Sequence, residues 1–543
     1  MRLSMNEIIR TAACWVVAAC LSGLALPATA RNLLTTHVPA IVARHAVPVT
    51  GAPDPRLRLQ LDIALPLRDS ESLTATLNAI YDPASPSWHR YLSVAEFTAR
   101  FGAAENDYRT AVDFFRTSGL RVTGLSANRL MIEVEGTVAD IERVFHVNLL
   151  LYKHPLEARS FMAPDREPTL DLGVPILHVT GLDDLVLPAP RVIPPAPPPP
   201  HWHGTGSGPH GYYYGSDLRA AYYGETKLAG KGQSVGLMEL VGYNPADVKL
   251  YFDDVKQPLH VPVKGISTDG KPWKCLTCND VEQALDIEYA ISMAPGLKQV
   301  QVYVGHSPES VLNRMASDDT SLQLSTSWGW GRNFDTDDAL FREMAVQGQT
   351  FLTASGDASS LRKSGPWPEE DANLVAVGGT DVVTTGPGGA WLSETGWSYS
   401  AGGPSLDRHI KIEAYQLPFI NNRNDGSTTL RNVPDIAANA NTDCWVCARG
   451  RCNGGWGGTS FASPMWAGYV ALINEEAAAN GQPPVGFLNP TLYTLADGGG
   501  YGLLFHDETE GKSGKYEAVK GYDLVTGLGS QNGKYLINAL GRP

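Results

Sequence analysis

A proline-rich segment at residues 188–200, Pro-Ala-Pro-Arg-Val-Ile-Pro-Pro-Ala-Pro-Pro-Pro-Pro, most constrains how this chain folds. Proline lacks a backbone N–H and fixes its own φ, so such a segment stays extended and cannot belong to a packed core. A chain of 543 residues, 43% of them hydrophobic, is also too long for one ordinary domain. We therefore predict one domain over residues 31–187 and another over residues 211–543, joined by a linker at residues 188–210.

The hydrophobic pattern differs between the two predicted domains. Before the linker, helical periodicities alternate with strand-like runs such as Leu130–Val134, which indicates a compact α+β domain. After the linker, short apolar runs alternate with helical segments, which favours an α/β fold with a mostly parallel sheet flanked by helices. These runs cover residues 234–240, 300–304, 322–325, 350–354 and 374–377. Ligands of such sheets bind beyond the carboxyl ends of the strands, so functional residues are expected there.

The N-terminus carries the pattern of a secretory signal. Arg2 and Arg10 precede an apolar stretch over residues 11–27, and residues 28–30 (Ala-Thr-Ala) fit a cleavage site. We expect residues 1–30 to be removed and the remaining chain to be secreted, with no membrane contact afterwards. The formal net charge of −14 argues against nucleic acid as a partner, and a monomer is expected.

Five cysteines remain beyond the signal: Cys275, Cys278, Cys444, Cys447 and Cys452. An odd number leaves one thiol unpaired if the others form disulfides. In an exported chain disulfides are favoured over structural zinc, which stays an alternative. The pairing is left open.

The stretch from Gly457 to Pro464 (Gly-Gly-Thr-Ser-Phe-Ala-Ser-Pro) places Ser460 between a glycine turn and an apolar helix expected over residues 465–474. The glycines permit a tight turn, and Pro464 suits a first helical turn. The positive end of that helix would face the Ser460 oxygen and favour developing negative charge there. Ser460 is therefore a candidate nucleophile, and a helix-capping serine is the alternative interpretation.

Carboxylates form the second candidate group. Residues 279–291 predict a helix on which Glu282 and Asp286, four residues apart, share one face. They form either a solvated acidic face or a carboxylate pair that shares a proton for acid–base chemistry. Asp357 follows the predicted strand at residues 350–354. It is either a helix cap or, when protonated, a hydrogen-bond donor to an oxyanion.

Taken in order along nearly the whole chain, these residues resemble the sedolisin (serine-carboxyl peptidase) family, including its kumamolisin-like members. The matching segments are residues 282–288, 325–329, 355–357, 377–380, 433–436 and 457–464 and, in a region similar to the family's propeptide, residues 88–93. The resemblance implies a subtilisin-like α/β fold preceded by a ferredoxin-like α+β prodomain. It also implies a zymogen that its own propeptide, residues 31–187, inhibits until the linker at 188–210 is cut.

By this resemblance, Ser460 attacks the carbonyl of a protein or peptide substrate, Glu282 takes its proton, Asp286 orients Glu282 and Asp357 stabilises the oxyanion. A histidine base is mostly protonated well below its usual pKa of about 6.5, whereas a carboxylate remains a base in acid. Activity at acidic pH is therefore expected.

The resemblance implies two further sets of residues. Glu239 and Trp328 match positions that support the acid pair in the family. One structural calcium ion is expected near the C-terminus, because aspartates and glycine-rich backbone offer the hard oxygen ligands that calcium prefers. Its ligands would be Asp507 and Asp523 through their side chains and Glu508, Val519 and Gly521 through their carbonyls.

Other functions remain open from the sequence. A histidine-based subtilisin is one, since His203-Gly204-Thr205-Gly206 superficially resembles the subtilisin histidine motif. A tripeptidyl-peptidase of the same family and a non-catalytic exported scaffold are the others. Nothing in the sequence suggests a blocked cleft, so an endopeptidase is favoured.

Overall fold

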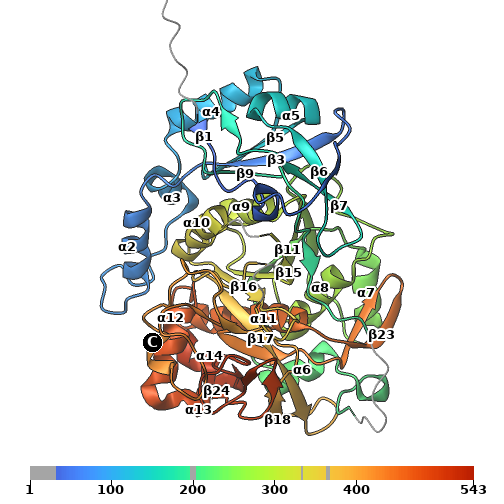
Figure 1. Ribbon diagram of the computed structural model, residues 1–543. Coiled ribbons are helices and arrows are strands. Elements are labelled where there is room, and N and C mark those ends of the chain that lie inside the picture. The colour runs from blue at the N-terminus through green and yellow to red at the C-terminus, as the bar shows by residue number, and fades with distance from the viewer. Residues whose placement is uncertain (1–31, 196–203, 332–333, 362–366, 543) are drawn as a thin grey trace, which may run out of the picture.

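The computed structural model describes residues 32–195, 204–331, 334–361 and 367–542, and in it the chain forms two packed domains. In Figure 1 the N-terminal domain, blue to cyan, caps the C-terminal domain, green to red. The predicted signal segment and His203 lie outside the described residues. No helix in the described ranges is both long enough and apolar enough to cross a bilayer.

The N-terminal domain contains an antiparallel sheet in the order β4-β5-β3-β9. Along the chain, β3 is followed by α4, β4, β5, α5 and β9, and this order with this pairing is the ferredoxin-like arrangement that the resemblance implied. The core lies between the sheet and the two helices, where Ile63 and Val134 pack with Phe115 and Ile141. The elements are β3 (Arg58–Ala64), α4 (Glu105–Thr117), β4 (Arg121–Leu125), β5 (Met131–Thr137), α5 (Val138–Phe145) and β9 (His178–Thr180).

Smaller elements complete this domain. They are β1 (Asn32–Leu33) paired with β8 (Thr169–Leu170), α1 (Ala40–Ala43), and a sheet of β2 (Val49–Gly51), β6 (Leu149–Lys153) and β7 (Ser160–Pro164). Two further helices, α2 (Ser70–Ile80) and α3 (Val94–Arg100), extend toward the C-terminal domain. A capping box of Ser93 and Glu96 begins α3, which satisfies N–H groups that the first helical turn leaves free.

The C-terminal domain is built on a sheet in the order β12-β13-β11-β14-β16-β17-β18, with β21 also pairing with β17. Its strands run parallel except β18, which is antiparallel to β17, so the predicted mostly parallel sheet is confirmed. The strands are β11 (Ser234–Glu239), β12 (Val263–Ser267), β13 (Gln299–Val304), β14 (Gln323–Thr326), β16 (Thr350–Ala354), β17 (Val375–Thr384), β18 (Trp391–Gly396) and β21 (Ile436–Asn439).

Helices cover both faces of this sheet. On one face α8 (Val281–Met293) packs against α11 (Thr459–Ala479), which crosses several strands. On the other, α9 (Pro308–Asp318) packs with α10 (Phe334–Val346) on the side of the N-terminal domain. The remaining helices are α6 (Gly215–Tyr222), α7 (Pro245–Asp254), α12 (Asn489–Leu495), α13 (Tyr501–Leu504) and α14 (Gly533–Gly541).

Short strand pairs lie around the sheet. They are β10 (Ala189–Pro190) with β15 (Trp328–Gly329), β19 (Gly403–Pro404) with β20 (Asn432–Val433), β22 (Cys444–Ala448) with β23 (Arg451–Trp456), β24 (Phe505–His506) with β27 (Ser530–Gln531), and β25 (Lys512–Ser513) with β26 (Tyr516–Glu517).

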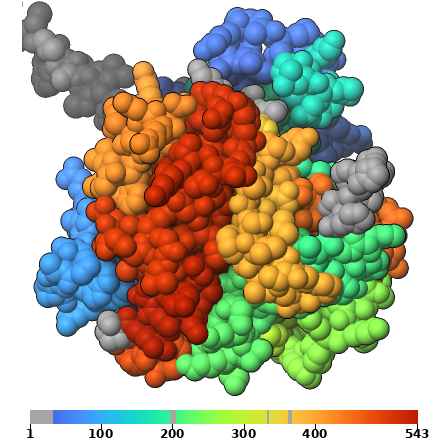
Figure 2. All heavy atoms as spheres, turned by 90° about the horizontal axis from the view of Figure 1, so that it is seen from below, coloured from blue at the N-terminus to red at the C-terminus, as the bar shows by residue number. Residues whose placement is uncertain are grey.

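The two domains share part of one hydrophobic core. Leu73 and Phe97, from α2 and α3, belong to the same buried cluster as the C-terminal domain. The Tyr81 hydroxyl donates to Ala345 O at 2.7 Å and accepts from Phe487 N at 2.7 Å. Figure 2, which views the molecule from below Figure 1, shows blue to cyan N-terminal atoms at the left and upper rim of a face that is otherwise green to red. The N-terminal domain therefore packs against the top and one side of the C-terminal domain, as Figure 1 shows.

Candidate active site

Ser460 lies inside the first turn of α11 and is fully buried. The helix begins at Thr459, so the predicted start at residue 465 is wrong, and Pro464 lies within the helix. The capping alternative for Ser460 is also wrong. The residue before the helix is Gly458, and the carboxylate of Asp357 accepts the Thr459 N–H at 2.9 Å. A carboxylate from the loop after β16 thus caps the helix, and the positive end of the helix favours it there.

Ser327 ties the start of α11 to the acid pair. Pro464 has no N–H to offer the Ser460 carbonyl, and the Ser327 hydroxyl lies 3.2 Å from that carbonyl instead. The same hydroxyl lies 2.8 Å from Asp286 Oδ1. A serine hydroxyl has one hydrogen, so both contacts are full hydrogen bonds only when Asp286 is protonated and donates to Ser327.

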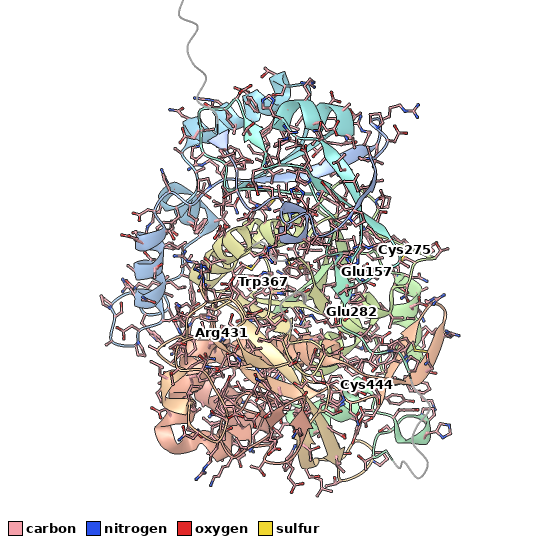
Figure 3. The ribbon with its side chains drawn as sticks, in the orientation of Figure 1. Glu157, Cys275, Glu282, Trp367, Arg431 and Cys444 are labelled. Carbon is pink, nitrogen blue, oxygen red and sulfur yellow. A yellow bond between two sulfur atoms is a disulfide. The ribbon has the colours of Figure 1, made fainter. Side chains whose placement is uncertain are left out.

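The predicted acid pair sits on α8, every residue of which is buried, so the solvated acidic face is excluded. Burial raises the pKa of Glu282 well above its usual value, and the Ser460 hydroxyl opposes this shift. Among the described residues neither Glu282 oxygen has a hydrogen-bond partner at standard geometry, so the Ser460 contact is close without being a formed hydrogen bond. Figure 3 shows Glu282 in the interior of the molecule.

Glu239 completes a group of three adjacent carboxyls. Burial raises its pKa to about 7, while the Trp328 indole, which donates to Glu239 Oε2 at 2.8 Å, lowers it. Burial, and then the charges of Glu239 and Glu282, raise the pKa of Asp286 well above its usual value. Carboxyls this close in a water-poor site cannot all be ionised, so they share protons.

Asp357 lies beyond the carboxyl end of β16, against the start of α11. Its Oδ1 accepts from both the N–H and the hydroxyl of Thr459, each at 2.9 Å. Its Oδ2 is buried and has no hydrogen-bond partner in the described chain. Burial raises the pKa of Asp357 to about 6, against the two Thr459 hydrogen bonds. In mild acid Asp357 is therefore a neutral acid whose proton is free to be donated from Oδ2.

The linker passes through this site as an extended strand. Ala189 and Pro190 (β10) pair antiparallel with Gly329 and Trp328 (β15). Beyond them, Arg191 N donates to Ser327 O at 2.9 Å. Ile193 exchanges two backbone hydrogen bonds with Gly457, at 2.7 and 3.3 Å. The chain is thus held on both sides of the Ser460 turn.

The structure therefore brings together all six residues predicted for catalysis and its support. Sequence reasoning missed Ser327 and Thr459, although both lie inside the motifs that carried the resemblance. It also missed Glu369, which binds Arg191 and lies in a stretch without periodicity or a motif.

The predicted calcium ligands also come together. Asp507 Oδ1 accepts from Gly521 N at 2.9 Å, and Asp523 Oδ2 accepts from Val519 N at 3.0 Å. Glu508 Oε2 is buried and lacks a hydrogen-bond partner among the described residues. Neighbouring carboxylates, one of them with a buried oxygen that lacks a partner, fit a hard cation such as calcium.

The cysteines pair within their own clusters. Cys275 bonds Cys278, and Cys447 bonds Cys452 across the β22–β23 hairpin. Cys444 is a free buried thiol, and Figure 3 shows it inside the molecule. Asp254 lies beside Cys447 and Cys452, but sulfurs joined in a disulfide are not thiolate ligands. The pairing thus supports disulfides over zinc.

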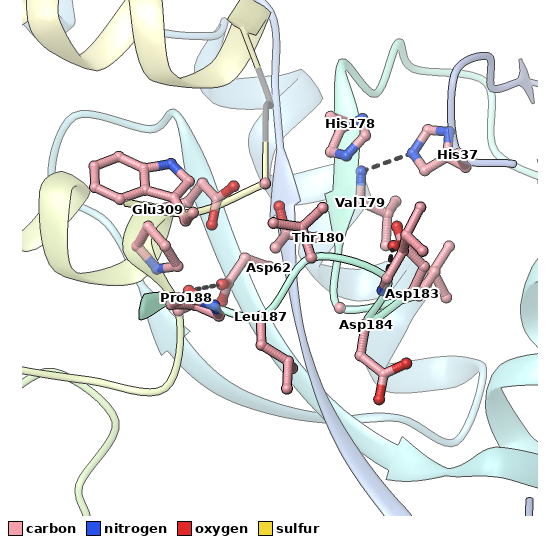
Figure 4. Close-up of a pocket in the computed structure, with 18 of the residues that line it drawn as sticks. His37, Asp62, His178, Val179, Thr180, Asp183, Asp184, Leu187, Pro188 and Glu309 are labelled. Atoms are coloured by element: carbon pink, nitrogen blue, oxygen red, sulfur yellow. Dashed lines mark hydrogen bonds between the residues drawn. The ribbon is translucent and has the colours of Figure 1, made fainter. Parts of the chain in front are cut away.

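A separate cavity of about 400 Å³ lies between the two domains. Figure 4 shows His178 beside His37 at one end, with His37 accepting from Val179 N, and Asp62 and Glu309 at the other. None of the predicted catalytic residues lines it. It belongs to the contact between the domains and not to the Ser460 site.

Comparisons with known proteins agree with this arrangement. Residues 47–185 match the family described as "Pro-kumamolisin, activation domain", and residues 318–494 match the "Subtilase family". Kumamolisin from Bacillus sp. (strain MN-32) is 29% identical over 494 residues, covering 84% of this chain and 87% of that protein. Tripeptidyl-peptidase 1 from Rattus norvegicus is 24% identical over 577 residues, covering 94% and 97%.

The solved structure of Pseudomonas sedolisin, complexed with two molecules of pseudo-iodotyrostatin, shares the fold. Its TM-score is 0.52 at 23% identity, over 59% of this chain and 95% of that one.

The protein is thus a serine-type peptidase with a subtilisin-like fold and an N-terminal activation domain. It is a homologue of kumamolisin, sedolisin and the tripeptidyl-peptidases, and its activation domain marks it as a zymogen. The alternative of a non-catalytic scaffold is not retained.

Proposed function

We propose that this peptidase is an acid-active endopeptidase with Ser460 as its nucleophile and Glu282 as its general base. One observation carries the proposal: Ser460 shares a buried site with carboxyl groups. The strongest influences on the Glu282 pKa besides burial are Ser460, Glu239, Asp357 and Arg191, and none of these is a histidine.

Each residue of the site has its own role in the proposed reaction. As Ser460 Oγ attacks the substrate carbonyl carbon, Glu282 takes the hydroxyl proton and the carbonyl oxygen becomes an oxyanion. Protonated Asp357 donates to that oxyanion from Oδ2. Glu282 then returns the proton to the leaving amine as the peptide C–N bond breaks. Water hydrolyses the acyl-enzyme by the same steps, again with Glu282 as base.

Asp286 orients Glu282 and shares its proton. Ser327 connects Asp286 to the carbonyl of Ser460, so the acid pair and the nucleophile are held to one another. Glu239 lies next to the pair and supplies a further site for the shared proton, and the Trp328 indole holds Glu239 in place by donating to its Oε2.

Acid activity follows from the protonation that Asp357 needs. With a pKa of about 6, Asp357 donates below that pH and loses its proton above it. Activity is therefore expected to fall as the pH rises through about 6.

Endopeptidase rather than tripeptidyl-peptidase activity is supported by the path of the linker. Residues 189–193 cross the site with chain continuing on both sides. A cleft that admits chain in both directions accommodates the interior of a polypeptide.

The wider organisation is part of the same proposal. Residues 1–30 act as a secretion signal, residues 31–187 as the inhibitory propeptide, residues 188–210 as the linker that is cut, and residues 211–543 as the secreted peptidase, a monomer. The two disulfides suit an oxidising compartment. One calcium ion, held by Asp507, Asp523 and nearby carbonyls, neutralises buried carboxylates and stabilises the C-terminal region.

The test is cleavage of unfolded casein between pH 3 and pH 9 by the acid-treated wild type and by Ser460→Ala and Glu282→Gln variants. We expect activity below pH 6 and a loss of at least about 1,000-fold in each variant. Peak activity at neutral pH that survives Glu282→Gln would indicate a histidine base. Release of only tripeptides would indicate a tripeptidyl-peptidase.

A further inference from the structure

We propose that this peptidase cleaves after arginine, that Glu369 recognises the arginine, and that its own Arg191–Val192 bond is the first substrate. The inference rests on the proposed function, because it names the substrate class of the Ser460 site.

Backbone register places the Arg191–Val192 bond at the nucleophile. Arg191 is held through its N–H by Ser327, at the end of β14, and Ile193 is held by Gly457, three residues before Ser460. Two peptide bonds lie between these anchors, Arg191–Val192 and Val192–Ile193, and the position of the Arg191 carbonyl selects the first. Extended peptides bind to such edges as added strands through main-chain hydrogen bonds, as residues 189–193 do here.

The Arg191 carbonyl points to the proposed oxyanion donor. A Cβ placed on Gly458 would overlap the Arg191 carbonyl oxygen and lie 2.7 Å from Asp357 Oδ2. Both oxygens therefore converge on the same space beside Gly458. That space is where a protonated Asp357 would donate to the oxygen of an attacked carbonyl.

The Arg191 side chain fills a charged pocket. Its guanidinium donates to Glu369 Oε2 at 2.6 Å and to Ala354 O at 2.7 Å. Both side chains are only 6% exposed. Gly356 adopts φ 107° and leaves space for the guanidinium, because a Cβ on Gly356 would lie 2.9 Å from Arg191 Nη1. A cavity of about 280 Å³, lined by Arg191, Glu369 and Ala401, lies beside the pair.

This pocket discriminates by charge. An arginine side chain pairs with Glu369, whereas leucine in the same place would leave a buried carboxylate and a carbonyl without partners. Sites whose buried polar groups lose their partner reject the wrong side chain strongly, so we expect a preference for arginine over leucine of at least about 100-fold in kcat/KM.

In the zymogen the reaction is hydrolysis of one bond. Ser460 Oγ bonds to the Arg191 carbonyl carbon, the C–N bond to Val192 breaks, and Glu282 delivers the proton to the new Val192 amine. Water then frees Arg191 as a carboxylic acid. The mature chain begins at Val192, and the propeptide ends at Arg191.

The peptide test uses acid-treated full-length protein and four blocked hexapeptides, Ala-Pro-Xaa-Val-Ile-Pro, with arginine, lysine, leucine or glutamate at Xaa. We expect cleavage after arginine at least about 100-fold faster than after leucine, and a collapse of that ratio in Glu369→Gln. Glu370→Gln is the matched control, because the neighbouring Glu370 carboxylate accepts from Ser405 and Leu406.

The outcomes separate the two proposals. Equal cleavage after arginine and leucine, or an arginine preference that survives Glu369→Gln, overturns this inference and leaves the proposed function standing. Cleavage of none of the peptides, together with inactivity on casein, contradicts the proposed function itself.

A second measurement follows self-cleavage. Acidified zymogen is expected to yield a new N-terminus at Val192, found by mass spectrometry, and Arg191→Leu to slow its appearance about 100-fold. A first cut elsewhere, at a rate that Arg191→Leu does not change, counts against the inference.

Discussion

At the residue scale, neighbouring carboxyls in the site differ in pKa because their hydrogen-bond donors differ. Asp357 keeps a pKa of about 6 because two hydrogen bonds from Thr459 offset part of its burial. Glu282 has no such donors besides Ser460, and its pKa stays well above the usual value. Local hydrogen bonds thus help to set the pKa of Asp357, while proton sharing among Glu239, Glu282 and Asp286 is what allows Glu282 to be ionised and to accept the serine proton.

Replacing Thr459 with valine tests the role of Asp357. The Thr459→Val variant loses one hydrogen bond to the ionised carboxylate, worth about 1 kcal/mol, so the Asp357 pKa rises by about 0.7 units. A group with a higher pKa stays protonated to higher pH. The alkaline limb of kcat/KM against pH is therefore expected to move up by that amount.

Thr459→Ser retains the hydroxyl and is the control, with the limb expected to stay in place. An unmoved limb in Thr459→Val would mean that Asp357 does not set it.

At the element scale, the first turn of α11 is where distant segments meet. Gly458 adopts φ 126°, a conformation that favours glycine. Asp357 caps the helix and Ser327 meets the carbonyl that Pro464 leaves free. These contacts hold Ser460 in the helix, one residue after the capped Thr459.

A methyl group on Gly458 would occupy the space of the substrate carbonyl. Gly458→Ala is expected to lower kcat/KM at least about 100-fold, because the Cβ collides with the Arg191 carbonyl oxygen and Asp357 Oδ2. Steady-state kinetics on a peptide substrate, with thermal melting beside it, measures this.

Gly232→Ala is the matched control, since Gly232 also has a positive φ, 79°, but a Cβ at this position would have no atom within 4 Å. Both substitutions cost roughly 1–3 kcal/mol of backbone strain. Equal kinetic losses in the two variants would attribute the effect to strain alone.

At the scale of the whole molecule, buried carboxyls link folding to pH. Burial raises the pKa of Glu133 and Asp319 to about 7 and that of Glu343 and Asp371 to about 8. Glu343 also accepts from Asn128 of the N-terminal domain at 2.7 Å. Acid therefore removes the buried charge of Glu343, although the hydrogen bond from Asn128 itself favours the ionised form.

Zymogen stability is expected to rise as the pH falls from 8 to 5. A carboxyl whose folded pKa is raised binds more protons in the folded than in the unfolded state over this range, so alkali destabilises the fold. Calorimetry of the inactive Ser460→Ala zymogen should give a Tm several degrees higher at pH 5 than at pH 8. A Tm that increases with pH contradicts this assignment.

Calcium removal tests the C-terminal cluster. Chelation with EGTA is expected to lower the Tm of the Ser460→Ala zymogen by several degrees, and titration calorimetry to find one ion per chain. In Asp507→Asn, chelation should have a much smaller effect. No calcium binding by calorimetry would rule out the proposed site.

The sequence by itself determined the elements and the chemical groups. The apolar run at residues 350–354 has the bounds of β16 (Thr350–Ala354), because hydrophobic patterning is a local property of the chain. The ordered motifs carried the resemblance to the sedolisin family and supplied the candidate residues, Ser460 and Glu282 among them.

Tertiary structure alone decided how those groups act. The true start of α11 depends on Asp357, which is 102 residues away in sequence. The burial of α8, the pairing of the cysteines and the Arg191–Glu369 ion pair likewise carry no local signal. Hydrogen bonds and desolvation act through space, so the protonation of each carboxyl and the choice of peptide bond appear only once distant segments meet.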